Sequence, residues 1–162
     1  MAEIVKIIRA DLANPAHGAA LVEMIDAYMR DPMELGAPAP EPVKRNLVPG
    51  LRANPSCRVL LAYRGDKPIG FSICFIGFST FNARPLVNIH DMFVDATARG
   101  AGIGRMLLDE VEAMAREMGS CRISLEVRED NIRARGVYRK FGFDVARIEP
   151  AHVTMEFWWK PL

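Results

Sequence analysis

The chain has 162 residues, of which 50% are hydrophobic and 25% charged, and these proportions exclude a disordered chain. Twenty-one Lys and Arg against twenty Asp and Glu leave a formal net charge of +1, too balanced for the broad basic face of a non-specific nucleic-acid binder. No apolar run reaches the roughly 18 residues of a membrane span. Three scattered cysteines indicate neither a disulfide framework nor a zinc site. We therefore expect a single domain over residues 1–162, in a reducing cytoplasm, without nucleic-acid or membrane partners.

The first third of the chain predicts a strand and two helices joined by a proline-rich loop. Asn14-Pro15 has the pattern of an N-cap followed by proline at the first helical position. Pro49-Gly50 is a candidate for an early break in the second helix. Because enzyme entrances are often built from loops, we expect the loop to shape substrate choice. The expected bounds are Ile4 to Arg9 for the strand, Asn14-Pro15 to Asp31-Pro32 and Glu41-Pro42 to Asn54-Pro55 for the helices, and Asp31 to Pro42 for the loop.

The rest of the chain alternates strands with two further helices. An antiparallel hairpin is expected about Arg64-Gly65-Asp66, and Gly119 and Gly142 are natural stops for the two helices. The first of these helices carries its apolar residues on one face. The expected strands are Arg58 to Tyr63, Lys67 to Phe78, Leu86 to Val94, Arg122 to Val127, Phe143 to Ile148 and His152 to Trp159, and the helices run from Gly100–Gly104 to Gly119 and from Asn131 to Lys140.

The predicted order is β-α-α-β-β-β-α-β-α-β-β, an α/β (α+β) fold with a mixed sheet and helices on both faces. The strand–helix–strand passage from Leu86 to Val127 implies a right-handed crossover and therefore a parallel pair. The other connections are hairpin-like, so the remaining strands are expected to pair antiparallel.

The segment from Arg99 to Arg105 (RGAGIGR) lies between a strand and a well-patterned helix. Its glycines let backbone N–H groups converge on an anion, and the helix N-terminus adds about half a positive charge. The Walker loop does not fit, because Gly104-Arg105-Met106 stands where Gly-Lys-Ser/Thr is required. The dinucleotide fingerprint does not fit either, because its third glycine would fall on Arg105 or Leu107.

The pattern Arg-x-x-Gly-x-Gly, here Arg99, Gly102 and Gly104, resembles the coenzyme A pyrophosphate loop of the GNAT superfamily of acyl-CoA N-acyltransferases. Further along, Asn131, Tyr138 and the closing Phe141-Gly142-Phe143 resemble the second signature of that superfamily. The similarity in motifs runs from about residue 70 to residue 143. Within the superfamily, the segments before the loop look most like the diamine acetyltransferase-type branch.

The resemblance implies a GNAT-type fold in which two neighbouring parallel strands, Leu86–Val94 and Arg122–Val127, splay apart around the pantetheine arm of acetyl-CoA. The arm would pair with one strand as an added strand. The residues implied in coenzyme binding are Met92, Phe93 and Val94 on that strand, Arg99, Gly100, Ala101, Gly102, Ile103, Gly104 and Arg105 at the pyrophosphate, Ser124, Leu125 and Glu126 on the other wall, and Asn131, Ala134 and Tyr138 towards the thioester.

The implied reaction is direct attack of a primary amine on the thioester in a ternary complex. Tyr138, a phenol with an ordinary pKa near 10, would protonate the leaving thiolate, and Asn131 lies two turns before it on the same helix face. An N–H near Phe93 would stabilise the oxyanion. His90 is the candidate base and stands where the diamine-type branch has glutamate. Strand alternation would send His90 and Asp91 to opposite faces, with Asp91 structural.

Several alternatives stay open on the sequence alone. The general base is His90, Asp91 or a water chain. The acetyl acceptor is a small-molecule amine, which we favour, or a protein or peptide amine. A non-catalytic acyl-CoA-binding or sensing module on the same fold is the rival from another class. No metal is expected, because His17 and His152 have no partner pattern. Trp158-Trp159 is expected on an edge strand that a second subunit would cover, which predicts a homodimer.

Overall fold

Long runs of apolar residues in the central strands build a sheet that is buried on both faces. The computed structural model describes residues 4–145, 147–148, 153–154 and 160–161. The chain folds as two compact units, Met1–Arg128 and Glu129–Leu162. The larger unit contains β1 (Val5–Arg9), α1 (Pro15–Arg30), α2 (Glu41–Ala53), β2 (Cys57–Arg64), β3 (Lys67–Ser79), β4 (Arg84–Val94), a short 3-10 helix (Ala96–Ala98), α3 (Ile103–Glu117) and β5 (Ile123–Leu125).

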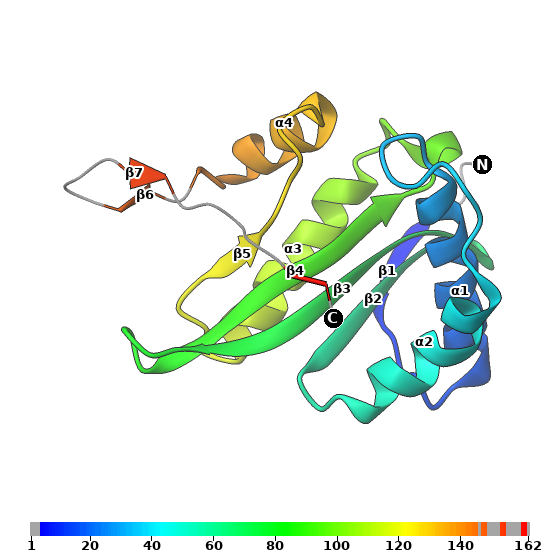
Figure 1. The fold of residues 1–162 in the computed structure, drawn as a ribbon, viewed down its shortest axis with the longest axis horizontal. Coiled ribbons are helices and arrows are strands. Elements are labelled where there is room, and N and C mark those ends of the chain that lie inside the picture. The colour runs from blue at the N-terminus through cyan, green and yellow to red at the C-terminus, as the bar shows by residue number, and fades with distance from the viewer. Residues whose placement is uncertain (1–3, 146, 149–152, 155–159, 162) are drawn as a thin grey trace. The chain divides into compact units, whose positions relative to one another are not determined.

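The five strands of the larger unit form one sheet in the order β1-β2-β3-β4-β5 (Figure 1). The first four strands pair antiparallel, and β4 pairs with β5 in parallel, as the strand–helix–strand pattern predicted. The mixed sheet and the element order are therefore confirmed. The strand β5 is shorter than expected, three residues instead of six, because its pairing with β4 ends at Leu125.

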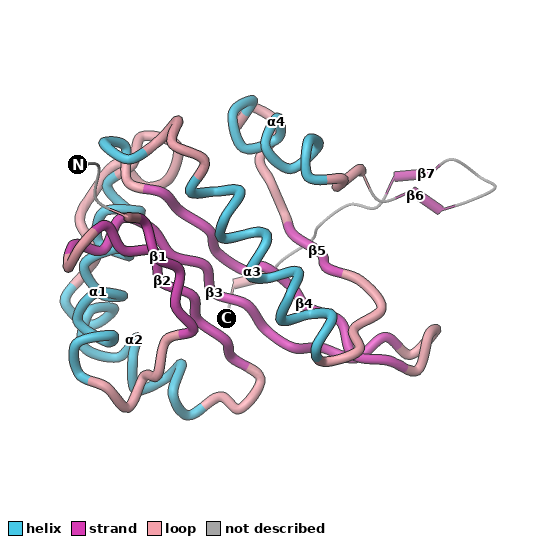
Figure 2. Tube along the Cα trace, turned by 180° about the vertical axis from the view of Figure 1, so that it is seen from behind, coloured by secondary structure: helices cyan, strands magenta, loops and turns pink. Residues whose placement is uncertain are grey.

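Alternation along the strands divides the core between the two faces of the sheet. On one face, the apolar stripe of α1 packs against side chains of β2, β3 and β4. This α1-side core contains Leu21, Met24, Ile25, Val59, Leu61, Phe71, Ile73 and Phe93. The helix α3 covers the other face with its own buried stripe and contacts β1, β3 and β4. Figure 1 shows α3 behind the sheet, and Figure 2, seen from behind, shows it in front.

The helix bounds follow the predicted caps. The Asn14 side chain accepts the Ala16 N–H at 3.0 Å at the start of α1, and Gly119 follows the end of α3 with a positive φ of 66°. The helix α2 continues through Pro49 to Ala53, so the proline does not break it early. Leu47 and Leu51, on either side of the proline, both pack on the α1-side core and hold the helix in place.

The smaller unit contains α4 (Ile132–Phe141) and a hairpin of β6 (Arg147–Ile148) and β7 (Val153–Thr154). Asn131 caps α4, and Gly142 ends it at a φ of 111°, as predicted. Strands are present in both predicted ranges, 143–148 and 152–159, but residues 143–145 are not part of one, and residues 146, 152 and 155–159 lie outside the described residues. Trp158-Trp159 lies outside the described residues.

Candidate active site

The parallel pair of strands separates part of the way along β4. The two strands pair only from Val87 to Ile89 on β4 and from Ile123 to Leu125 on β5. From Asp91 to Val94, β4 still pairs with β3 on one side, whereas on the other side the described part of the chain supplies no strand. The predicted coenzyme residues Met92, Phe93 and Val94 therefore lie on a strand edge whose backbone groups can pair with an extended ligand.

Where the two strands still pair, their side chains also interact. The Asn88 amide donates to the Ser124 hydroxyl at 3.3 Å, directly across the pair. Ser124 and Leu125 thus lie on the wall opposite β4, whereas Glu126 follows the end of β5 and is exposed.

A β-bulge marks the point of separation. Ile73 pairs with Asp91 and Cys74 pairs with Ile89, which leaves His90 as the extra residue of β4. The exposed His90 ring meets the edge of Phe75, with ring centroids 5.3 Å apart, and Phe75 packs on the α1-side core. Asp91 lies opposite Ile73 of the same core. The prediction that alternation separates His90 and Asp91 is therefore wrong, because the bulge turns both towards the α1 face.

Two carboxyl groups come together on this face. Asp91 is partly buried, and this burial raises the pKa of its carboxyl group while the neighbouring His90 lowers it. Glu34, from the loop between the two N-terminal helices, also has its pKa raised, mainly by burial and in smaller part by Asp91. The Tyr28 hydroxyl donates a hydrogen bond to Glu34 and, with the positive charge of Arg128, opposes that rise. Glu34 and Tyr28 carry no motif that predicts them as site residues, and the only signal in the sequence was the loop's expected role in substrate choice.

Residues 31–40, which we call the acceptor loop, are held in place by hydrogen bonds at both ends. The Asp31 carboxylate accepts the Met33 N–H at 2.9 Å, and the Met29 carbonyl accepts the Ala37 N–H at 3.3 Å. At the far end, the Asp26 carboxylate accepts the Ala39 N–H at 2.9 Å. These bonds fix the loop that carries Glu34.

The glycine loop between β4 and α3 has the backbone that an anion site needs. Gly100 and Gly102 have φ values of 82° and 78°, in the left-handed region that only glycine adopts without strain. The first hydrogen bond within α3 runs from the Met106 N–H to the Gly102 carbonyl at 3.0 Å. The N–H groups of Ile103 and Gly104 come before Met106 in the helix, so they have no acceptor within α3, and they lie at the positive end of the helix dipole. Apart from the glycine itself and its two chain neighbours, no atom of the described residues lies within 4 Å of the position that a Cβ would take at Gly100 or Gly102.

The two arginines that flank the glycine loop make different contacts. The Arg99 Nε donates to the Val94 carbonyl at 2.9 Å, and its Nη2 pairs with the Asp31 carboxylate at 2.5 Å. Arg105 pairs with Asp109, one turn further along α3, at 2.8 Å and is exposed. The Arg99 guanidinium therefore points to Asp31 at the C-terminal end of α1.

The second unit carries the remaining predicted site residues. The Asn131 side chain accepts the Ala134 N–H at 3.1 Å as the cap of α4. Tyr138 lies two turns later and is largely buried, with its ring edge against Phe143 at 5.9 Å between centroids. Burial raises the pKa of Tyr138 to about 12, so its hydroxyl is protonated at neutral pH.

The described residues contain no group of three or more His, Cys, Asp or Glu side chains that could hold a metal ion. Within the same residues, no helix has both the length and the apolar character to cross a membrane.

The parallel strands β4 and β5 separate beside a glycine-rich helix start, as the GNAT resemblance implied. The chain belongs to the acetyltransferase (GNAT) family, which matches residues 21–143. Among relatives, the IAA acetyltransferase of Azospirillum brasilense is 31% identical over 125 residues, which cover 76% of this chain and 74% of that protein. An uncharacterised N-acetyltransferase of Methanocaldococcus jannaschii is 34% identical over 90 residues, 55% of this chain but only 40% of that protein's length.

The same fold occurs in solved structures. An aminoglycoside acetyltransferase from an uncultured soil metagenomic sample superposes with a TM-score of 0.77 at 18% identity, over 98% of this chain and 97% of that one. The family match over residues 21–143 and the relatives show membership of the GNAT acetyltransferase family, and the solved structure shows that the fold is shared. The superfamily resemblance is confirmed, and the diamine acetyltransferase-type branch stays a prediction.

Proposed function

We propose that this chain transfers the acetyl group of acetyl-CoA to a small-molecule primary amine that arrives as a cation. The observation that carries the proposal is the edge of β4 from His90 to Val94. At its start lie His90 and Asp91, with Glu34 of the acceptor loop near Asp91, and beyond its end comes the glycine loop. An extended pantetheine arm paired with this edge would have its pyrophosphate at the glycine loop and its thioester towards the carboxyl groups.

The chemistry assigned to each residue follows from its surroundings. An alkylamine with a pKa of about 10.4 is protonated at neutral pH and must lose a proton before it attacks the thioester. His90 accepts that proton, directly or through water, and Asp91 and Glu34 attract the incoming ammonium group. The amine nitrogen then forms the new C–N bond, the N–H near Phe93 stabilises the oxyanion, and the C–S bond breaks. Tyr138 donates its proton to the departing thiolate, and the second proton of the acylated nitrogen returns through water to Tyr138, which leaves a neutral amide and a protonated phenol. Asn131 caps the helix that carries Tyr138.

The acceptor class rests on charge. Carboxyl groups of Glu34 and Asp91 favour an amine with positive charge. A structurally similar protein, solved in two complexes, carries the name aminoglycoside acetyltransferase, and one of those complexes contains sisomicin. A protein or peptide amine is the second candidate. The proposal includes a cytoplasmic homodimer that uses acetyl-CoA as acyl donor and no metal.

A thiol-release assay with acetyl-CoA tests the proposal. The acceptor panel contains polyamines, amino acids, aminoglycosides, and lysine or N-terminal peptides, and calorimetric titration of acetyl-CoA runs beside it. We expect acetyl-CoA to bind and one of the small-molecule classes to be acetylated. Binding without turnover on any class would favour the acyl-CoA-sensing alternative, and absence of binding would overturn the proposal.

The substitution His90→Gln tests the proton acceptor. We expect kcat/KM to fall by about 100-fold, in the range of general-base catalysis, and the acidic limb of its pH profile to disappear. Because the charge of His90 lowers the pKa of Asp91, removing it raises that pKa further. A limb that persists and moves to higher pH would therefore contradict the assignment and identify Asp91 as the base.

A further inference from the structure

The side chain of Arg99 joins two loops that are far apart in the sequence. Its Nη2 reaches the Asp31 Oδ2 at 2.5 Å, and its Nε donates to the carbonyl of Val94, the last residue of β4, at 2.9 Å. The guanidinium carbon also lies 5.5 Å from the centre of the Phe93 ring. Three different groups therefore fix the orientation of one side chain.

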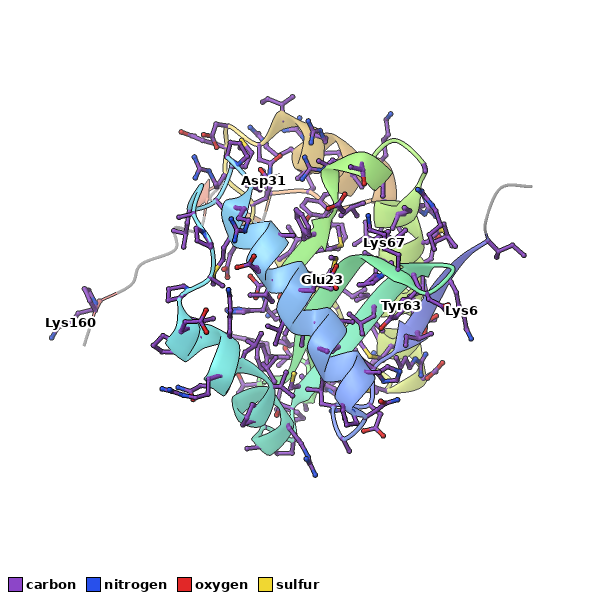
Figure 3. All side chains as sticks on the ribbon, turned by 90° about the vertical axis from the view of Figure 1, so that its right-hand side faces the viewer. Lys6, Glu23, Asp31, Tyr63, Lys67 and Lys160 are labelled. Atoms are coloured by element: carbon purple, nitrogen blue, oxygen red, sulfur yellow. The ribbon has the colours of Figure 1, made fainter. Side chains whose placement is uncertain are left out.

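On the other side of this contact, Asp31 stands at the entrance of the acceptor loop. Figure 3 shows it at the end of α1, where the chain leaves the helix. One carboxylate oxygen, Oδ1, accepts the Met33 N–H of the loop, while the other accepts Arg99. Asp31 is thus bound to the acceptor loop and to the start of the glycine loop at the same time.

The ion pair between Arg99 and Asp31 is partly buried, so its loss should have a measurable effect. The side chains of Arg99 and Asp31 are 27% and 11% exposed, whereas the ion pairs on the outer face of α3 are mostly open to solvent. Water screens a half-buried pair less than a surface pair, and removing one partner leaves a charge without its counterpart. Loss of this contact should therefore have a larger effect than loss of a surface pair.

We propose that Arg99 is a positioning residue that, through Asp31, holds the acceptor loop against the end of β4. On this assignment Arg99 acts mainly on amine binding, by keeping Glu34 near Asp91, and not by neutralising the coenzyme pyrophosphate as the sequence pattern implied. The assignment rests on the proposed function for its kinetic consequence, but its structural consequence, order in the acceptor loop, does not depend on any activity.

The substitutions Arg99→Gln and Asp31→Asn, and their combination, test the assignment. Asn at position 31 keeps an oxygen for the Met33 N–H but cannot pair with a guanidinium. We expect each single change to raise KM for the amine about tenfold while Kd for acetyl-CoA stays within about twofold, and the double variant to be no worse than either single, because the two residues act as a pair. Arg99→Lys should recover part of the loss, since it keeps the charge but not the planar fork.

Hydrogen exchange supplies a readout without catalysis. In the protein without ligands, both single changes should speed amide exchange over residues 31–39. The control Glu112→Gln removes the exposed Glu112–Arg116 pair on α3 and should leave both exchange and kinetics unchanged. Failure of the parent protein to bind acetyl-CoA would contradict the proposed function. The exchange result would still decide whether Arg99 orders the acceptor loop, because it is measured without ligands.

Two results would overturn the assignment. Unchanged exchange of residues 31–39 in both variants would show that the contact does not hold the loop. A rise in Kd for acetyl-CoA in Arg99→Gln, with an unchanged KM for the amine in Asp31→Asn, would show instead that Arg99 binds the coenzyme pyrophosphate.

Discussion

Gly102→Glu is expected to abolish acetyl-CoA binding, with Kd raised at least about 100-fold. Two unit charges about 4 Å apart interact by about 4 kcal/mol near a protein surface, and each 1.4 kcal/mol is about a tenfold change in affinity. Gly102 is the N-cap of α3, next to the N–H groups of Ile103 and Gly104 that we expect to bind the pyrophosphate. A carboxylate at position 102 would therefore repel the pyrophosphate. Calorimetric titration with acetyl-CoA measures the effect.

The same substitution should leave the protein folded. The left-handed φ of 78° costs a side chain about 1–2 kcal/mol, but a carboxylate is favourable at a helix N-terminus and no atom obstructs the Cβ. Gly119→Glu is the matched control: it has a φ of 66°, open space around the Cβ and the same added charge, but it lies at the opposite end of α3. We expect Gly119→Glu to bind acetyl-CoA normally, and retained affinity in Gly102→Glu would mean that the phosphate site lies elsewhere.

The features of the fold that the sequence predicted are those governed by local chemistry. Asn14, Gly119 and Gly142 mark helix ends because capping and left-handed φ depend on a few neighbouring residues. The parallel pairing of β4 and β5 follows from a strand–helix–strand order that has few alternatives. Both kinds of information are present in short stretches of sequence.

The features that the sequence did not predict depend on contacts between distant segments. The bulge at His90 exists because β3 and β4 shift register between Ile73 and Cys74, and no pattern within β4 alone reports that shift. The same is true of Glu34 near Asp91 and of Arg99 on Asp31, a pair 68 residues apart. Short stretches of sequence therefore predict caps and strand order better than the orientation of side chains that depends on distant segments.

Tyr138→Phe is expected to lower kcat by about 100-fold or more, the usual range for loss of a general acid, with little change in Kd for acetyl-CoA. Phenylalanine keeps the ring that meets Phe143 edge-on, so the change removes the proton donor and little packing. Tyr63→Phe, a half-buried tyrosine of β2, is the matched control and should leave kcat unchanged. Steady-state thiol release for the three proteins makes the comparison.

The pH profile and the leaving group show whether the lost hydroxyl acts as an acid. Burial raises the pKa of Tyr138 to about 12, so the proton is present at every pH below that value and the parent enzyme should show no loss of rate from Tyr138 between pH 7 and about 10. An acetyl thioester whose thiol has a lower pKa needs less protonation as it leaves, so the defect of Tyr138→Phe should shrink with such a donor. An equal defect with both donors would assign Tyr138 to packing or substrate orientation, and unchanged turnover would remove it from the reaction.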